Sequence, residues 1–245
     1  MAFGWQGVRV ERMTSSTALD FSAADSEPGS ITPLPLKGAW LFTPRVFEDE
    51  RGSFHEWFRT EQFTDHMGYP FDVAQANLSR STQGVIRGVH VAEVPPGQAK
   101  FVTCVAGSVR DVLVDLRKGS PTFGKHVVIE LSEENNAGVF IPLGVGHGFT
   151  ATSERATLNY QVTEAYDPER EFEINPFDAT LDIDWGIDRE QAVVSEKDSK
   201  APSLEEVNGR LASWNEVRGW EKELRDSWAE AMTAAEEWEI AEGED

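Results

Sequence analysis

The fold class is indicated most clearly by one stretch, which reads Phe101-Val102-Thr103-Cys104-Val105-Ala106-Gly107-Ser108-Val109-Arg110-Asp111-Val112-Leu113-Val114-Asp115-Leu116. Two runs rich in β-branched residues lie on either side of Ala106-Gly107-Ser108, which is a tight-turn signal. The pattern predicts two strands, at residues 101–105 and 109–116. Similar runs, bounded by Gly, Pro, Asn and Asp, predict further strands at residues 126–131, 139–142 and 157–163.

Short strand-like runs continue from about residue 39 to residue 185 without the alternation of strands and helices that a parallel sheet needs. We therefore expect a mainly β protein built as an antiparallel jelly roll, with a helical extension at its C-terminus. Residues 1–36 are interpreted as an N-terminal extension, and Ser26–Pro35 as a linker, because Ser, Pro, Gly and charges mix there without periodicity. The main domain is expected at residues 37–202 and an acidic, Trp-rich tail at residues 203–245.

The tail has the periodicity of a helix. Its apolar residues recur every three or four positions, at Leu211, Trp214, Val217, Trp220, Leu224, Trp228, Ala231, Ala235 and Trp238. Such spacing places them along one helical face. We expect this face to pack on the β domain or on a neighbouring subunit, and the alternative is a helix that recruits another protein.

Composition narrows the class of protein. The chain has 245 residues, of which 40% are hydrophobic, so it can bury a sizeable core. A net charge of −21 argues against nucleic acid and against an anionic membrane as partners. No apolar run reaches the roughly 20 residues that cross a bilayer, and the first thirty residues lack the apolar core of a secretory signal, so a cytoplasmic protein is expected. The single cysteine, Cys104, lies in an apolar run and is expected to be a buried hydrophobe.

Candidate functional residues cluster in Gly84-Val85-Ile86-Arg87-Gly88-Val89-His90 and in the Lys100 that follows. An arginine, a histidine and a lysine on adjoining strands suit phosphate binding and proton transfer next to a carbonyl. The three-residue spacing points Arg87 and His90 to opposite faces of a regular strand, so they share one site only if the strand bends.

A metal centre is the competing hypothesis for the histidines. His147 lies in Gly144-Val145-Gly146-His147-Gly148, where the glycines indicate either a turn or a close approach to the backbone. Metal-binding barrels of the cupin type often use a His-x-His pair, and none of the five histidines forms one. We therefore expect no metal site.

Several motifs, taken together and in order, resemble the dTDP-4-dehydrorhamnose 3,5-epimerase family over about residues 37–202. The motifs are Asp49-Glu50-Arg51-Gly52 with Glu56, Gln75-x-Asn77-x-Ser79, Arg87-Gly88-Val89-His90, Lys100, Ser120-Pro121-Thr122-Phe123-Gly124-Lys125, His147-Gly148-Phe149, Tyr160, Tyr166 and Lys197-Asp198. The resemblance implies a cupin-type jelly roll and a cofactor-independent epimerase of dTDP-4-keto-6-deoxyglucose in deoxysugar biosynthesis, such as that of rhamnose.

The resemblance also implies roles for single residues. His90 matches the catalytic base, Asp198 the carboxylate that orients it, and Tyr160 the acid on the opposite face of the sugar. Lys100 and His147 match residues around the 4-keto oxygen and the ring, and Tyr166 the aromatic that stacks on thymine. The matches to other nucleotide, phosphate and substrate contacts are Arg51, Glu56, Gln75, Asn77, Arg87, Glu171 and Lys197. In the family, Arg51 and Glu56 tend to serve the neighbouring subunit's site, which implies a homodimer.

Two departures leave the regiochemistry open. Val91-Ala92-Glu93 follows His90 where the common form of the family has an aromatic and a glutamine, and Ala165 stands where many members have a second tyrosine. These residues resemble a subgroup that makes unusual deoxysugars, some of whose members invert only C3 or only C5. Epimerisation at both carbons is the main prediction, a single position is the first alternative, and a non-catalytic sugar-nucleotide-binding cupin and a metal-dependent cupin isomerase or dioxygenase are the others.

Overall fold

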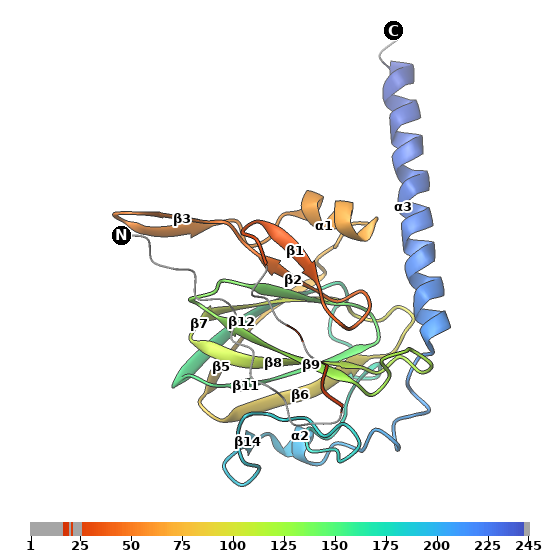
Figure 1. Cartoon of the computed structure of the whole chain (residues 1–245). Coiled ribbons are helices and arrows are strands. Elements are labelled where there is room, and N and C mark those ends of the chain that lie inside the picture. Colours follow the sequence, from red (N-terminus) through yellow and green to blue (C-terminus); the bar gives the residue numbers. More distant parts are fainter. Residues whose placement is uncertain (1–16, 20, 22–25, 243–245) are drawn as a thin grey trace.

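The computed structural model describes residues 17–19, 21 and 26–242, and within them two antiparallel sheets face one another (Figure 1). The first sheet has the order β1 (Ser30–Pro33), β2 (Trp40–Thr43), β10 (Gly138–Ile141), β7 (Lys100–Ala106), β12 (Arg155–Val162) and β5 (Gln75–Thr82). The second has the order β13 (Glu171–Glu173), β6 (Val85–Ala92), β11 (Val145–Ala151), β8 (Ser108–Asp115) and β9 (His126–Ser132), with the short β14 (Val193–Val194) parallel to β6. The predicted jelly-roll class is confirmed.

The core lies between the sheets because each contributes one apolar face. Val102 and Leu158 of the first sheet pack with Leu113 and Ile129 of the second, and all four are buried. Successive side chains of a strand point to opposite faces of its sheet, so every second residue of these strands can reach the core between the sheets. All five predicted strands are present, with ends that differ from the prediction by at most two residues.

The turn that joins the two runs of the opening stretch connects different sheets. β7 belongs to the first sheet and β8 to the second, so the chain crosses from one to the other at Gly107. This residue has φ +71, and a Cβ there would lie 2.0 Å from the Arg155 carbonyl oxygen. Only glycine fits this crossing.

One interpretation of the N-terminal part changes. Ser30–Pro33 form β1, which pairs with β2, so the linker interpretation is wrong for these residues. Pro33 ends a strand at the sheet edge, where its missing N–H costs little. Farther toward the N-terminus, Ala18 forms an isolated bridge with His126.

Helices and one hairpin complete the chain. β3 (Val46–Asp49) and β4 (Gly52–His55) form a hairpin that extends away from the two sheets (Figure 1), followed by α1 (Thr60–Met67). The short α2 (Glu196–Ser199) lies beside β6, and α3 (Trp214–Glu242) is the predicted tail helix. Among the described residues no helix is long and apolar enough to cross a membrane.

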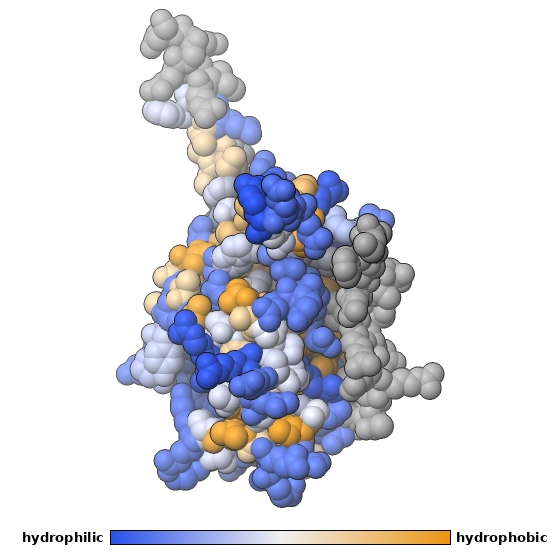
Figure 2. Space-filling view, turned by 90° about the vertical axis from the view of Figure 1, so that its left-hand side faces the viewer, coloured by the Kyte–Doolittle hydropathy of each residue, from blue (hydrophilic) through white to orange (hydrophobic). Residues whose placement is uncertain are grey.

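The tail docks over its first turns only. Ser213 and Glu216 form a capping box that starts α3, so Leu211 precedes the helix. Val217 is fully buried, and Trp220 and Leu224 pack on the same aromatic cluster. Farther along, α3 projects beyond the body (Figures 1 and 2), and Trp238 is 63% exposed. The expected packing is confirmed for the proximal half. The distal half is longer than the surface that this chain offers it, and its packing on a neighbouring subunit stays a prediction.

Candidate active site

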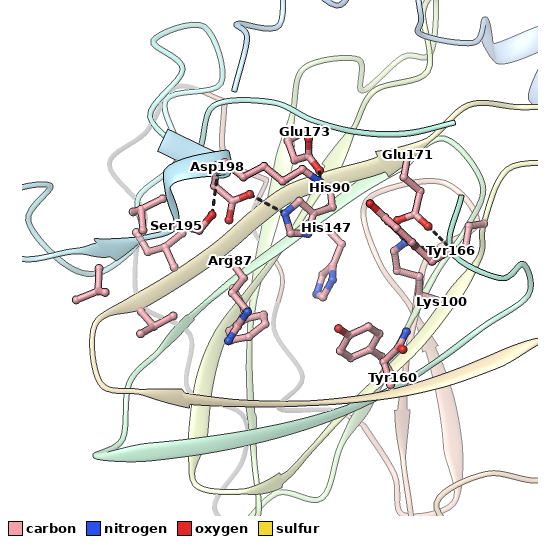
Figure 3. A pocket seen from close by; sticks show the side chains of 18 of the residues that line it. Arg87, His90, Lys100, His147, Tyr160, Tyr166, Glu171, Glu173, Ser195 and Asp198 are labelled. Atoms are coloured by element: carbon pink, nitrogen blue, oxygen red, sulfur yellow. Dashed lines mark hydrogen bonds and ion pairs between the residues drawn. The ribbon is translucent and has the colours of Figure 1, made fainter. Parts of the chain in front are cut away.

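A cavity of about 680 Å³ opens between the sheets and the segment around α2 (Figure 3). Its volume is in the range of small-molecule sites. It is lined by every predicted site residue except Arg51 and Glu56, namely Gln75, Asn77, Arg87, His90, Lys100, His147, Tyr160, Tyr166, Glu171, Lys197 and Asp198.

A bulge in β6 resolves the spacing of Arg87 and His90. His90 lies opposite His147 of β11 and Arg87 lies opposite Phe149, so three steps on β6 match two on β11. The extra residue returns both side chains to the same face. Gly88 lies within the bulge, and a Cβ there would be 2.5 Å from the Gly148 Cα. The strand therefore bends as one shared site requires.

His90 is held by a buried carboxylate. Its Nε2 lies 3.0 Å from Asp198 Oδ1, and the Asp198 side chain is 6% exposed. Burial alone would raise the pKa of Asp198, but hydrogen bonds and charge from His90, with contacts from Ser195 and Gly88, hold it below its ordinary value. Because an ionised carboxylate only accepts, Nε2 carries the hydrogen, and Nδ1 of neutral His90 has the basic lone pair.

Ser195 fixes the position of that carboxylate. It caps α2, and its Oγ accepts a hydrogen bond from the Asp198 backbone N at 3.0 Å. A serine at this position satisfies one of the unpaired N–H groups of the first turn. The cap therefore aligns Asp198 with the imidazole.

A second histidine–aspartate pair adjoins the first. His147 Nε2 lies 2.8 Å from Oδ2 of Asp111, which is completely buried in β8. The pairing of His147 with His90 across β11 and β6 brings the two imidazoles to one wall of the cavity (Figure 3).

The opposite wall comes from the first sheet. Tyr160 lies on β12, between Asn77 of β5 and Val102 of β7. Burial raises the pKa of Tyr160, although Arg87 acts in the other direction, so the phenol keeps its proton at neutral pH. His90 and Tyr160 thus face one cavity from two different sheets.

Lys100 enters the cavity from β7, beside Tyr160. It is buried, and this burial lowers its pKa to about 8, against the opposing influence of Glu171. Its Nζ donates to Gln98 Oε1 at 2.5 Å. A protonated lysine here places a positive charge in a water-poor site.

Two further cations and a tyrosine lie around the mouth. Arg87 donates to Ser81 Oγ at 3.1 Å and, among the described residues, has no carboxylate partner. Lys197 forms an ion pair with Glu173. The Tyr166 ring is at the cavity edge and is 54% exposed. This arrangement suits an anionic ligand with a flat aromatic group.

The comparisons with known proteins agree with this geometry. A family model described as dTDP-4-dehydrorhamnose 3,5-epimerase matches residues 33–206. A dTDP-4-dehydrorhamnose 3,5-epimerase of Mycobacterium tuberculosis is 41% identical over 195 residues, which are 78% of this chain and 96% of the relative. A dTDP-4-dehydro-6-deoxyglucose 3-epimerase of a Streptomyces species is also 41% identical, over 191 residues, with the same coverage of each chain. The solved structure of an M. tuberculosis epimerase superimposes with a TM-score of 0.77 at 40% identity, covering 80% of this chain and all of that one.

The chain belongs to the dTDP-4-dehydrorhamnose 3,5-epimerase family. The resemblance seen in the motifs is therefore confirmed, as is the assignment to a family of sugar-nucleotide isomerases. The matched residues end at 206, so α3 lies outside the family match.

Two predicted residues of the epimerase family lie away from the cavity. Arg51 is at the tip of the β3–β4 hairpin, where it pairs with Asp49, and its side chain is 84% exposed. Glu56 pairs with Arg59. A role for Arg51 and Glu56 in the site of a neighbouring epimerase subunit stays a prediction.

Sequence reasoning missed four polar residues of the candidate site. Gln98, Glu173 and Ser195 line the cavity, and Asp111 lies behind His147. The Ser195-x-x-Asp198 spacing is a helix-start signal that could have revealed Ser195. For Asp111, the only signal in the sequence is that a carboxylate interrupts a run of apolar strand residues.

Among the described residues, no group of three or more His, Cys, Asp or Glu is placed to hold a metal ion. Cys104 is buried as expected, and burial raises the pKa of its thiol to about 11.

Proposed function

We propose that the protein is a cofactor-independent epimerase that inverts C3 and C5 of dTDP-4-keto-6-deoxyglucose. The observation that carries the proposal is the position of His90 with Asp198 on one wall of the cavity and Tyr160 on the other. Inversion at carbon requires removal of a proton from one face and its return to the other. Two proton-transfer groups on opposite walls meet that requirement.

Each step uses groups of this chain. The lone pair of His90 takes the proton from the carbon beside the ketone, and Asp198 stabilises the imidazolium that forms. The electron pair of the broken C–H bond becomes an enolate, whose oxygen is stabilised by the Lys100 ammonium. Tyr160 then donates its phenolic proton to the carbon from the other side, and exchange with solvent restores both groups.

One ketone suffices for two inversions. C3 and C5 both flank C4, so the same carbonyl acidifies the protons on both carbons. Double epimerisation therefore needs the same pair, His90 and Tyr160, to reach each carbon in turn.

The nucleotide is assigned to the mouth of the cavity. Arg87 offers a guanidinium that can bind a diphosphate bidentately, and the exposed Tyr166 ring offers a surface for thymine. Gln75 and Asn77 supply hydrogen-bonding amides on the same wall as Tyr160.

The test of the proposal is proton exchange in heavy water. Wild-type protein incubated with dTDP-4-keto-6-deoxyglucose in D₂O should incorporate deuterium at C3 and at C5, and NMR of the product should show inversion at both. Binding without exchange would favour a non-catalytic sugar-nucleotide-binding cupin instead.

A single-position epimerase is the second candidate. It is supported by the relative that is named a 3-epimerase and is as similar as the 3,5-epimerase. Deuterium at only one of the two carbons would establish it and overturn double inversion.

The proposal includes a homodimer in which each hairpin completes the partner's site. Arg51→Ala and His90→Ala variants, each inactive alone, should then complement one another. In a mixed dimer one site has both mutations and the other has none, so random mixing should restore about a quarter of wild-type activity. No recovery after mixing would show that Arg51 does not act in trans. A cytoplasmic location and independence of any cofactor also belong to the proposal.

A further inference from the structure

The side-chain amide of Gln98 lies between two charges of opposite sign. Gln98 is 9% exposed and lies two residues before Lys100, the first residue of β7. Its Oε1 accepts from Lys100 Nζ at 2.5 Å, and its Nε2 donates to Glu171 Oε1 at 3.0 Å and to the Glu164 carbonyl oxygen at 2.9 Å. An ammonium only donates hydrogen bonds and a carboxylate only accepts them, so only this one of the two amide orientations satisfies both partners.

The amide keeps the ammonium and the carboxylate apart. Among the described residues, Lys100 forms no direct ion pair with Glu171, although both line the cavity and both are bonded to Gln98. Lys100 uses one of its three hydrogens on Gln98, which leaves the others for a ligand. A direct pair with Glu171 would turn the ammonium toward the wall and neutralise its charge.

We infer that Gln98 is a positioning residue that aims the Lys100 ammonium at the substrate's carbonyl oxygen and keeps Glu171 from neutralising it. The inference rests on the proposed function, in which that oxygen becomes an enolate. Gln98 itself exchanges no proton with the substrate.

A neutral side chain is essential to this role. Glutamate at position 98 would form an ion pair with Lys100. This pair would weaken the electrostatic stabilisation of the enolate oxygen and would raise the pKa of Lys100. Methionine would keep nearly the same length and volume but would remove the amide, so Lys100 could turn to Glu171.

The first experiment needs no substrate. Lysines are labelled with ¹³C at Cε, the Lys100 signal is assigned by its loss in Lys100→Met, and its titration is followed by NMR. Gln98→Glu should raise the Lys100 pKa by at least about one unit, as an added opposite charge within hydrogen-bond reach does. Gln83→Glu is the matched control, because Gln83 is exposed in the β5–β6 turn and its substitution adds the same charge. An unchanged Lys100 titration in Gln98→Glu, or an equal shift in both variants, would overturn the inference.

The second experiment measures deuterium exchange and epimerisation against pH. Gln98→Met and Gln98→Glu should both lower kcat about 10- to 100-fold at pH 7, less than the loss typical of removing an oxyanion donor, with little change in KM. In Gln98→Glu, the pH above which kcat declines should also be higher than in the wild-type enzyme. Wild-type kcat in both variants would refute the positioning role. If the wild-type enzyme itself exchanges no proton, the proposed function fails, whereas the NMR titration still decides the placement of Gln98 beside Lys100.

Discussion

Replacing Tyr160 by phenylalanine should separate proton removal from inversion. The substitution deletes one hydroxyl and keeps the ring that packs against the core. Among the described residues that hydroxyl has no hydrogen-bond partner, so unfolding free energy should stay within about 0.5 kcal/mol of wild type. Inversion should fall by about 10² to 10⁴, the usual contribution of a positioned proton donor, which is about 3–5 kcal/mol of barrier.

Exchange on the original face should survive, because His90, Asp198 and Lys100 remain. The assay compares deuterium in recovered substrate with deuterium in inverted product, by NMR, at equal substrate saturation. His90→Ala should abolish both signals, and Tyr69→Phe, which alters a half-buried tyrosine outside the cavity, should change neither. Equal loss of exchange and inversion in Tyr160→Phe would refute its role as the proton donor and leave it a packing or positioning residue.

Three further predictions concern other parts of the chain. Asp198→Asn should lower exchange about 10²-fold, less than His90→Ala, because the imidazole stays while its supporting charge is lost; wild-type exchange would contradict the pairing. Exchange by the wild-type enzyme should fall as pH rises through about 8, since Lys100 is protonated below its pKa and neutral above it; a rate that keeps rising to pH 10 would exclude a charged lysine. Ending the chain at Arg225 should leave the melting temperature unchanged. Deleting all of α3 should destabilise the protein by at least about 2 kcal/mol, because it exposes the apolar surface against which Val217 is buried. Equal melting temperatures of the two truncated proteins would contradict docking of the proximal turns.

Local chemistry allowed much of the fold to be predicted from sequence. β-branched runs between Gly, Pro and Asn marked the strands, because a strand's side-chain period and turn residues are local properties. The helical period of the tail predicted α3 but included Leu211, whereas the cap formed by Ser213 and Glu216 starts the helix at Trp214. The residue types of the candidate site were also visible in the sequence, since histidine, lysine and tyrosine can transfer protons whatever surrounds them, and the family resemblance singled out His90, Lys100 and Tyr160.

Contacts between distant segments were decided only by the tertiary structure. The bulge at Gly88 exists because β6 must follow β11, and it alone turns Arg87 and His90 to one face. Gln98 meets Glu171 across 73 positions of sequence, and His147 meets Asp111 across 36. Such pairings depend on which strands become neighbours, and periodicity along one strand does not encode its neighbours. The number of α3 turns that pack against the rest of the protein was also decided by the tertiary structure. Amphipathic spacing predicts an apolar face of a helix, but it does not predict which surface covers that face.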